Sequence, residues 1–129
     1  MVVGLGIDVT SIRRIARAMG RFGDRFAQRV LTPVERVEWS QGGYRAEFLA
    51  GRFAAKEAVV KALGGPADVS WHDIEVRRAA SGAPELQLLG AAGHSAERLG
   101  VERRLVSISH DAEVAVAVVV LEANGEVTK

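Results

Sequence analysis

The most constraining part of this sequence is a continuous helix-forming segment from Ala46 to Gly64. Ala, Leu, Glu, Lys and Arg dominate it, no proline interrupts it, and Gly64-Gly65-Pro66 is a stop signal. We expect the rest of the chain to pack around this helix. The helical repeat predicts a hydrophobic stripe at Leu49, Phe53, Val60 and Leu63, widened by Phe48, Val59 and Ala62.

Glu57 and Lys61 stand four residues apart in this segment, so they lie one above the other on the same side of the helix. Ala50 and Ala54 share roughly that side, which predicts a strip of small side chains with room for a ligand. The alternative is an ordinary Glu-Lys pair on an exposed helix, worth about 0.2–0.5 kcal/mol. The spacing alone favours the ordinary pair, but other parts of the sequence favour a ligand-binding role for Glu57 and Lys61.

Length and composition indicate a single domain spanning residues 1–129, with 48% hydrophobic residues available for a core. The longest hydrophobic run, Val114 to Leu121, is too short for a membrane span. The start Val2-Val3-Gly4 has neither the basic residues nor the cleavage site of a signal peptide. The absence of cysteine excludes disulfides, thiolate catalysis and cysteine-ligated metals. We therefore expect a cytoplasmic enzyme or binding domain.

The formal net charge of +1 conceals an asymmetry along the chain. Residues 1–61 contain eleven Lys or Arg against six acidic residues, which favours an acidic protein or a phosphate-rich ligand as partner. The weak overall charge and 5% aromatic content argue against nucleic acid. Arginines gather in the first predicted helix and just after it, which is typical of either a solvated face or a docking surface. They are Arg13, Arg14, Arg17, Arg21 and Arg25.

The remaining elements are short helices and strands. Helices are predicted at 11–19, 24–30, 32–40 and 91–99, with Gly20 and Gly23 ending the first and Thr32-Pro33 starting the third. Strands are predicted at 2–9, 74–78, 85–89, 105–110 and 114–121. The second and third form a hairpin, the last is expected to be buried on both faces, and the tail from Asn124 is polar. Gly4 and Gly6 in the first strand allow close backbone contact.

Asp8 lies near the end of the first strand, where a carboxylate is costly to bury unless it is paired or binds a cation. It could also cap the helix that follows, but Thr10 or Ser11 could do so equally well.

Asp8 and Glu57 are carboxylates from separate elements in a chain with no cysteine and no histidine cluster, which suits Mg²⁺. Lys61, one turn beyond Glu57, could neutralise a phosphate held by that ion. His110 ends the alternating strand 105–110 and is the fourth candidate. These residues alone suggest metal-assisted phosphoryl or phosphodiester chemistry without naming a substrate.

Three segments in this order resemble the holo-acyl-carrier-protein synthase type of 4′-phosphopantetheinyl transferase. They are Gly6-Ile7-Asp8 followed by Arg13-Arg14-Ile15, the run from Arg52 to Ala62, and Val106 to His110. The segments 29–32, 47–51 and 73–76 are also similar to that family, so the resemblance covers nearly the whole chain. It implies an α+β fold with a small antiparallel sheet packed against a long central helix and additional short helices.

The resemblance implies transfer of 4′-phosphopantetheine from coenzyme A to a serine of apo acyl carrier protein, in support of fatty acid or polyketide biosynthesis. Adenosine 3′,5′-bisphosphate is the other product. In that family, residues matching Asp8 and Glu57 hold Mg²⁺ against the pyrophosphate of coenzyme A, and the residue matching Lys61 lies near the phosphates. Those matching Arg52, Lys56 and His110 lie at or beside the coenzyme site.

The resemblance also implies protein partners. The arginine row Arg13, Arg14, Arg17 and Arg21 corresponds to the helix that docks the acidic recognition helix of the carrier protein. The family typically assembles as a homotrimer with active sites at the subunit interfaces. The chain departs from the family at Ser11, where members often carry Glu, and in the loop Gly64–Val69, which is shorter than expected.

In the expected mechanism, Asp8 and Glu57 hold Mg²⁺ at the β-phosphate and Lys61 offsets charge on the leaving bisphosphate. The general base stays open between a metal-bound water, Glu57 and His110. Asp111 either orients the imidazole of His110 or opens a turn.

Two other functions compete with this prediction. A serine hydrolase using Ser109 and His110 is excluded, because adjacent residues on a strand point to opposite faces. A non-catalytic basic docking module for an acidic protein would explain the arginines but not Asp8, Glu57 and Lys61.

Overall fold

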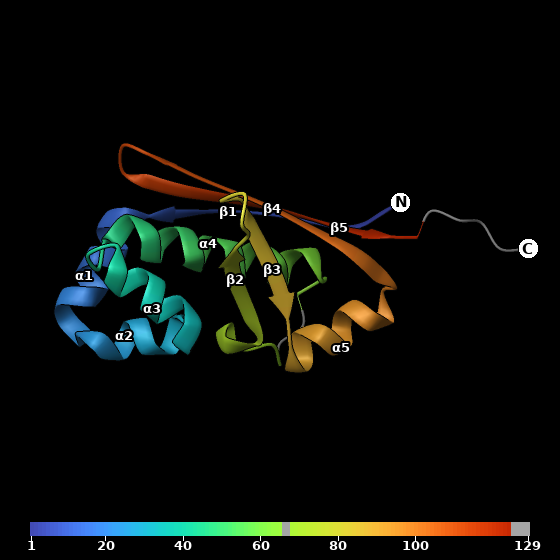
Figure 1. Ribbon diagram of the computed structural model, residues 1–129, viewed down its shortest axis with the longest axis horizontal. Helices are drawn as coiled ribbons and strands as arrows, with labels where there is room; N and C mark the ends of the chain where they lie inside the picture. Colours follow the sequence, from blue (N-terminus) through green and yellow to red (C-terminus); the bar gives the residue numbers. More distant parts are fainter. Residues whose placement is uncertain (66–67, 125–129) are drawn as a thin grey trace, which may run out of the picture.

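The computed structural model describes residues 1–65 and 68–124, which form five α-helices, one 3₁₀ turn and five strands (Figure 1). The helices are α1 (Ile12–Phe22), α2 (Asp24–Val30), α3 (Pro33–Gln41), α4 (Ala46–Ala62) and α5 (Gly90–Arg98), and the 3₁₀ turn is η1 (Trp71–Asp73). The strands are β1 (Val2–Ser11), β2 (Ile74–Arg78), β3 (Pro84–Leu88), β4 (Val101–Asp111) and β5 (Val114–Ala123). The predicted α+β class is confirmed.

The central helix α4 packs against an antiparallel sheet whose strand order is β1-β5-β4 (Figure 1). The contact with β1 depends on two glycines of that strand. A Cβ atom added to Gly6 would lie 1.9 Å from the carbonyl oxygen of Ala58, and one added to Gly4 would lie 2.2 Å from that of Ala62. The backbone of β1 therefore lies directly on α4, as the predicted close contact required.

The opposite face of this sheet is apolar and exposed. Leu5, Ile7 and Val9 of β1 are 65%, 55% and 61% exposed. The outward residues of β5 are only partly buried, whereas Ala117 and Val119 on its inner face are fully buried. The prediction that β5 is buried on both faces is therefore wrong for this chain, because α4 covers one face and no described helix covers the other (Figure 1).

The helix α4 is buried on nearly every side instead of on one stripe. Ala50 and Ala54 are both fully buried. Ala50 belongs to a core cluster that includes Ala115, and Ala54 belongs to one that includes Ala117. The predicted room for a ligand above these small side chains is wrong, because the sheet fills that space. No helix among the described residues is long and apolar enough to span a bilayer.

Element bounds differ from the prediction at a few points. Gly20 lies inside α1, and Gly23, with φ 60°, separates α1 from α2. The strand β4 begins at Val101 instead of residue 105, because its charged start pairs with β5 and Arg103 forms an ion pair with Glu122 at 3.6 Å. The predicted polar tail beyond Asn124, and Pro66 in the loop after α4, lie outside the described residues.

Candidate active site

Asp8 and Glu57 line the same pocket, which has a volume of about 290 Å³ and lies between β1, α1, α2 and α4. Asp8 does not cap α1, because Ser11 Oγ accepts the hydrogen bond from the backbone N–H of Arg14 at 3.2 Å. The carboxylate of Asp8 is thus available to the pocket. The sequence predicted that these two acids meet, and the structure brings them to one cavity.

Lys61 lies beside Asp8 and does not pair with Glu57 among the described ion pairs. Its Nζ donates to Asp8 Oδ1 at 3.2 Å and to the carbonyl of Ile7 at 2.9 Å. Thr10 Oγ1 donates to Asp8 Oδ2 at 2.7 Å, which holds the other oxygen. The interpretation of Glu57 and Lys61 as an ordinary helical pair is therefore wrong. The sequence indicated Thr10 only as a possible helix cap; its hydrogen bond to Asp8 was not predicted, although two residues apart on a strand lie on the same face.

The donor set of this pocket fits a hard divalent cation. Glu57 Oε2 accepts a hydrogen bond from Trp71 Nε1 at 2.8 Å, and Oε1 has no hydrogen-bond partner among residues 1–65 and 68–124. Within that part of the chain no group of three or more His, Cys, Asp or Glu side chains could hold a metal. Two carboxylates with space for water and substrate oxygens suit Mg²⁺, which takes one or two carboxylates, better than Zn²⁺ or Ca²⁺.

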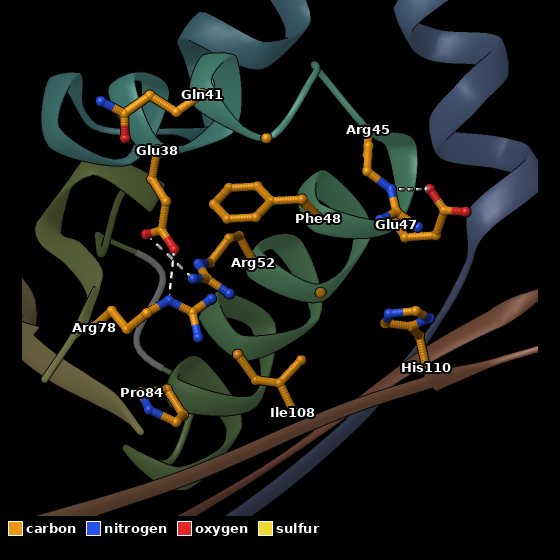
Figure 2. A pocket seen from close by; sticks show the side chains of 12 residues that line it. Glu38, Gln41, Arg45, Glu47, Phe48, Arg52, Arg78, Pro84, Ile108 and His110 are labelled. Atoms are coloured by element: carbon orange, nitrogen blue, oxygen red, sulfur yellow. Dashed lines mark hydrogen bonds and ion pairs between the residues drawn. The ribbon is translucent and has the colours of Figure 1, made fainter. Parts of the chain in front are cut away.

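Arg52 and His110 line a different pocket, of about 510 Å³, together with Arg45 and Arg78. Figure 2 shows Glu38 between two of these cations. Glu38 Oε2 accepts from Arg78 Nε at 2.8 Å, and Oε1 accepts from Arg52 Nη2 at 3.5 Å. The pocket is predominantly basic, which suits a phosphate-bearing ligand.

Arg52 is an unusual member of this pocket because it is only 6% exposed. Its guanidinium carbon lies 4.2 Å from the centroid of the Phe48 ring, and its Nε is the one buried side-chain nitrogen or oxygen in the described chain without a hydrogen-bond partner. Burial lowers the pKa of Arg52 despite the opposing effect of Glu38. The pKa of nearby Glu47 is also lowered, chiefly by a hydrogen bond from its own backbone N–H.

The two pockets do not merge within one chain. Asp8 is on β1 and His110 is on β4, and β5 runs between these strands. Two strand spacings amount to about 10 Å, and the two residues also lie on different cross-strand rows. The structure therefore brings Asp8, Glu57 and Lys61 together but leaves Arg52 and His110 apart from them.

Lys56 lies in neither pocket, and its side chain is fully buried. Its Nζ donates to Glu35 Oε1 at 2.7 Å and to the carbonyls of Trp71 and Ile74 at 3.0 and 2.6 Å. Burial lowers the pKa of Lys56, and the Glu35 carboxylate opposes that shift. All three donors of the ammonium are occupied, so a coenzyme could contact Lys56 only if these bonds broke.

Glu35 organises a buried polar cluster that was not predicted from the sequence. It completes the capping box of α3 with Thr32, and its Oε2 accepts from the backbone N–H of Val76 at 2.6 Å. Thr32 Oγ1 donates to Glu75 at 2.6 Å. Burial alone would raise the pKa of Glu75, but the hydrogen bonds from Thr32 and Arg77 outweigh it and the pKa is lowered. Thr32-Pro33-Val34-Glu35 signalled the capping box, but no local pattern signalled its partner Lys56.

The arginines of α1 are exposed beside the Asp8 pocket. Arg14 lines that pocket, and Arg13 forms an exposed ion pair with Glu113 at 3.4 Å. Arg17 and Arg21 are exposed further along the helix, and Arg21 lies 5.3 Å from the centroid of the Phe22 ring. The predicted arginine row therefore continues from the pocket rim along one helix.

Comparisons with known proteins agree with this arrangement. The family model described as the 4′-phosphopantetheinyl transferase superfamily matches residues 4–119. The holo-[acyl-carrier-protein] synthase of Nitratidesulfovibrio vulgaris strain DP4 is 54% identical over 125 residues, covering 95% of this chain and 100% of that protein. The crystal structure of the Neisseria meningitidis holo-[acyl-carrier-protein] synthase matches with a TM-score of 0.85 and 39% identity, over 95% of this chain and 99% of that one.

A second similar structure was solved with a ligand bound. The Helicobacter pylori holo-[acyl-carrier-protein] synthase in complex with coenzyme A matches with a TM-score of 0.80 and 35% identity, over 92% of this chain and 99% of that one. The match in sequence, length and fold extends over nearly all described residues of the chain. This chain belongs to the 4′-phosphopantetheinyl transferase superfamily.

Proposed function

We propose that this protein is a Mg²⁺-dependent holo-acyl-carrier-protein synthase. It transfers 4′-phosphopantetheine from coenzyme A to a serine of apo acyl carrier protein, and releases adenosine 3′,5′-bisphosphate. The observation that carries the proposal is that Asp8 and Glu57 line one pocket, that Lys61 binds Asp8 there, and that the pocket rim continues into an arginine-rich helix. Relatives at 54% and 52% identity bear the name of this enzyme, and a neighbour at 35% identity was solved with coenzyme A. A role in fatty acid biosynthesis and a cytoplasmic location, which the absence of cysteine suits, belong to the same proposal.

The residues have separate roles in this reaction. Asp8 and Glu57 would hold Mg²⁺, which would polarise the phosphate of coenzyme A that the serine attacks. Lys61, beside Asp8, would offset the negative charge that develops on the leaving bisphosphate. Glu57 or His110 would accept the serine proton directly, or a water at the site would do so. His110 lies in the other pocket, so within one chain Glu57 is the better placed of the two side chains.

We also propose that a second copy of the chain completes the site, within a homotrimer. The basic pocket with Arg52 and His110 would then supply coenzyme contacts to the Asp8 pocket of a neighbour. Two observations support this arrangement: the two pockets are separate in one chain, and the outer sheet face with Leu5, Ile7 and Val9 is exposed and apolar. An apolar sheet face of this kind is typical of a protein–protein interface.

Ile7→Asp should disrupt that assembly and lower the transfer rate with it, because it places a charge in the apolar face. The measurement is light scattering coupled to size-exclusion chromatography, followed by the transfer assay. Val34→Asp is a matched control, since Val34 is 52% exposed on α3, away from the sheet. A wild-type monomer with full activity would overturn the trimer proposal.

Reversing the charge of the arginine row should weaken carrier binding specifically. Arg17→Glu with Arg21→Glu should raise the KM for apo carrier protein at least about ten-fold, because like charges at an interface are strongly repulsive. The KM for coenzyme A should stay near the wild-type value, since neither residue lines a described pocket. Arg29→Glu with Arg98→Glu makes the same charge change at two exposed arginines outside α1 and the sheet. A docking role for α1 would be contradicted if both double variants changed the KM for carrier protein and the KM for coenzyme A to the same extent.

Mass spectrometry of an apo carrier protein incubated with this enzyme, coenzyme A and Mg²⁺ tests the function itself. We expect a mass gain equal to one phosphopantetheine arm, and no gain when a chelator replaces Mg²⁺. The competing function is a non-catalytic module that docks an acidic protein through the same arginines. No mass gain on several apo carriers, together with carrier binding by the folded protein, would favour the docking module.

A further inference from the structure

Trp71 contacts Glu57 from outside the pocket, and nothing in the proposed mechanism uses it. Its indole Nε1 donates to Glu57 Oε2 at 2.8 Å. We infer that Trp71 is a positioning residue that fixes the carboxylate of Glu57, so that the other oxygen, Oε1, is presented to the pocket shared with Asp8. The inference deepens the proposed function, because it depends on Glu57 being a metal ligand.

Trp71 is itself held on three sides. Its carbonyl accepts from Lys56 Nζ at 3.0 Å, and Lys56 precedes Glu57 on α4. Its ring packs against Phe53 with centroids 5.4 Å apart and planes at 58°. The next residue, His72, shares a 2.6 Å hydrogen bond between its Nε2 and the carbonyl of Gln28 on α2. The indole donor is therefore fixed relative to α4 before any ligand binds.

The contacts of Trp71 also include the buried Lys56. Adjacent residues of α4 hold the two ends of the tryptophan: Lys56 binds the backbone carbonyl, and Glu57 accepts from the indole. Phe53 lies one turn before Glu57 and lines the same pocket. Because Phe53 also packs against Trp71, the residue that binds the Glu57 carboxylate is in contact with the pocket wall. Partners that hydrogen-bond to metal-ligating carboxylates typically contribute about ten-fold or more to metal affinity.

The first experiment measures metal binding directly. Mg²⁺ is titrated by calorimetry into the protein saturated with coenzyme A, without carrier protein. Trp71→Phe keeps an aromatic ring against Phe53 but removes the N–H donor, and we expect about ten-fold weaker Mg²⁺ binding. Trp39→Phe is the matched control. Trp39 also donates its indole N–H, in this case to the carbonyl of Arg45 at 3.1 Å, but it lines neither the Asp8 pocket nor the His110 pocket.

The transfer assay separates positioning from general destabilisation. Trp71→Phe should raise the Mg²⁺ concentration for half-maximal rate about ten-fold, and leave the KM for carrier protein unchanged. Wild-type metal affinity in a folded Trp71→Phe protein would overturn the inference while the proposed function stands. A wild-type protein that transfers at full rate with the chelator would overturn the metal assignment, and the inference with it.

A second measurement does not depend on the folding of Trp71→Phe. The sequence contains two tryptophans, so ¹⁵N-labelled wild-type protein has two indole N–H resonances, which Trp39→Phe assigns. Addition of Mg²⁺ in the presence of coenzyme A should move the Trp71 indole resonance and not that of Trp39. The Glu57→Gln variant should lose this response. An unmoved Trp71 resonance, while calorimetry shows wild-type metal binding, would overturn the inference.

Discussion

Glu57→Gln should lower the rate of phosphopantetheine transfer by about a thousand-fold or more. A metal ion that polarises a phosphoryl oxygen contributes several kcal/mol to the transition state, and each 1.4 kcal/mol is about ten-fold in rate. The change removes one of the two carboxylates that meet in the Asp8 pocket. The fold should persist, because the amide oxygen of Gln can still accept the hydrogen bond that Trp71 Nε1 donates to Glu57.

The measurement is the single-turnover rate by mass spectrometry at saturating coenzyme A and carrier protein, with thermal unfolding to confirm the fold. Glu97→Gln is the matched control, because Glu97 is an exposed acid on α5 that lines neither described pocket. It should retain the wild-type rate. A folded Glu57→Gln protein with near-normal turnover would show that the metal is held elsewhere or is not used.

Lys56→Met should have the largest effect on stability. Removing one member of a buried ion pair costs about 3–5 kcal/mol, because the remaining charge is left uncompensated. Here the charge would be the carboxylate of Glu35, and the carbonyls of Trp71 and Ile74 would lose their donor as well. The free energy of unfolding should fall by about that amount in denaturant titrations, with an unchanged m-value.

Two further variants separate the ion pair from other effects of the mutation. The double variant Glu35→Gln, Lys56→Met should lose less free energy of unfolding than the two single variants lose in sum. The reason is that the double variant removes both charges and leaves no unpaired charge buried. Lys61→Met removes an exposed lysine from its ion pair with Asp8, and should change stability by about 1 kcal/mol at most. A Lys56→Met protein of wild-type stability but with a raised KM for coenzyme A would instead favour the coenzyme-binding role predicted from the resemblance.

Much of the architecture follows from local patterns in the sequence. The length and composition of α4, the capping box at Thr32 and the alternation of β4 between Val106 and His110 all depend on neighbours within a few residues. The two glycines of β1 likewise predicted a close backbone contact, but they did not predict that the contact is with α4. Such patterns predict which segments are helices or strands, because hydrogen bonding and side-chain periodicity are local.

The packing around α4 was not predictable in the same way. A helix rich in alanine has small side chains on several sides, and the pattern does not tell which side a sheet will cover. The strip with Ala50 and Ala54 thus appeared open to a ligand but is filled by the sheet. Similarly, the apolar alternate residues of β5 suggested burial on both faces, whereas one face belongs to an exposed sheet surface.

In the site, too, the sequence indicated the residues, whereas their contacts depended on the tertiary structure. Asp8, Glu57 and Lys61 could be chosen from the sequence, because a carboxylate in an apolar strand and charges on an alanine-rich helix are costly without a ligand or a partner. Only the tertiary structure decided that Lys61 pairs with Asp8, that Trp71 holds Glu57, and that Lys56 is committed to Glu35. These contacts join residues 14 to 53 positions apart. Pairings over such separations depend on how whole elements pack, and no local pattern encodes them.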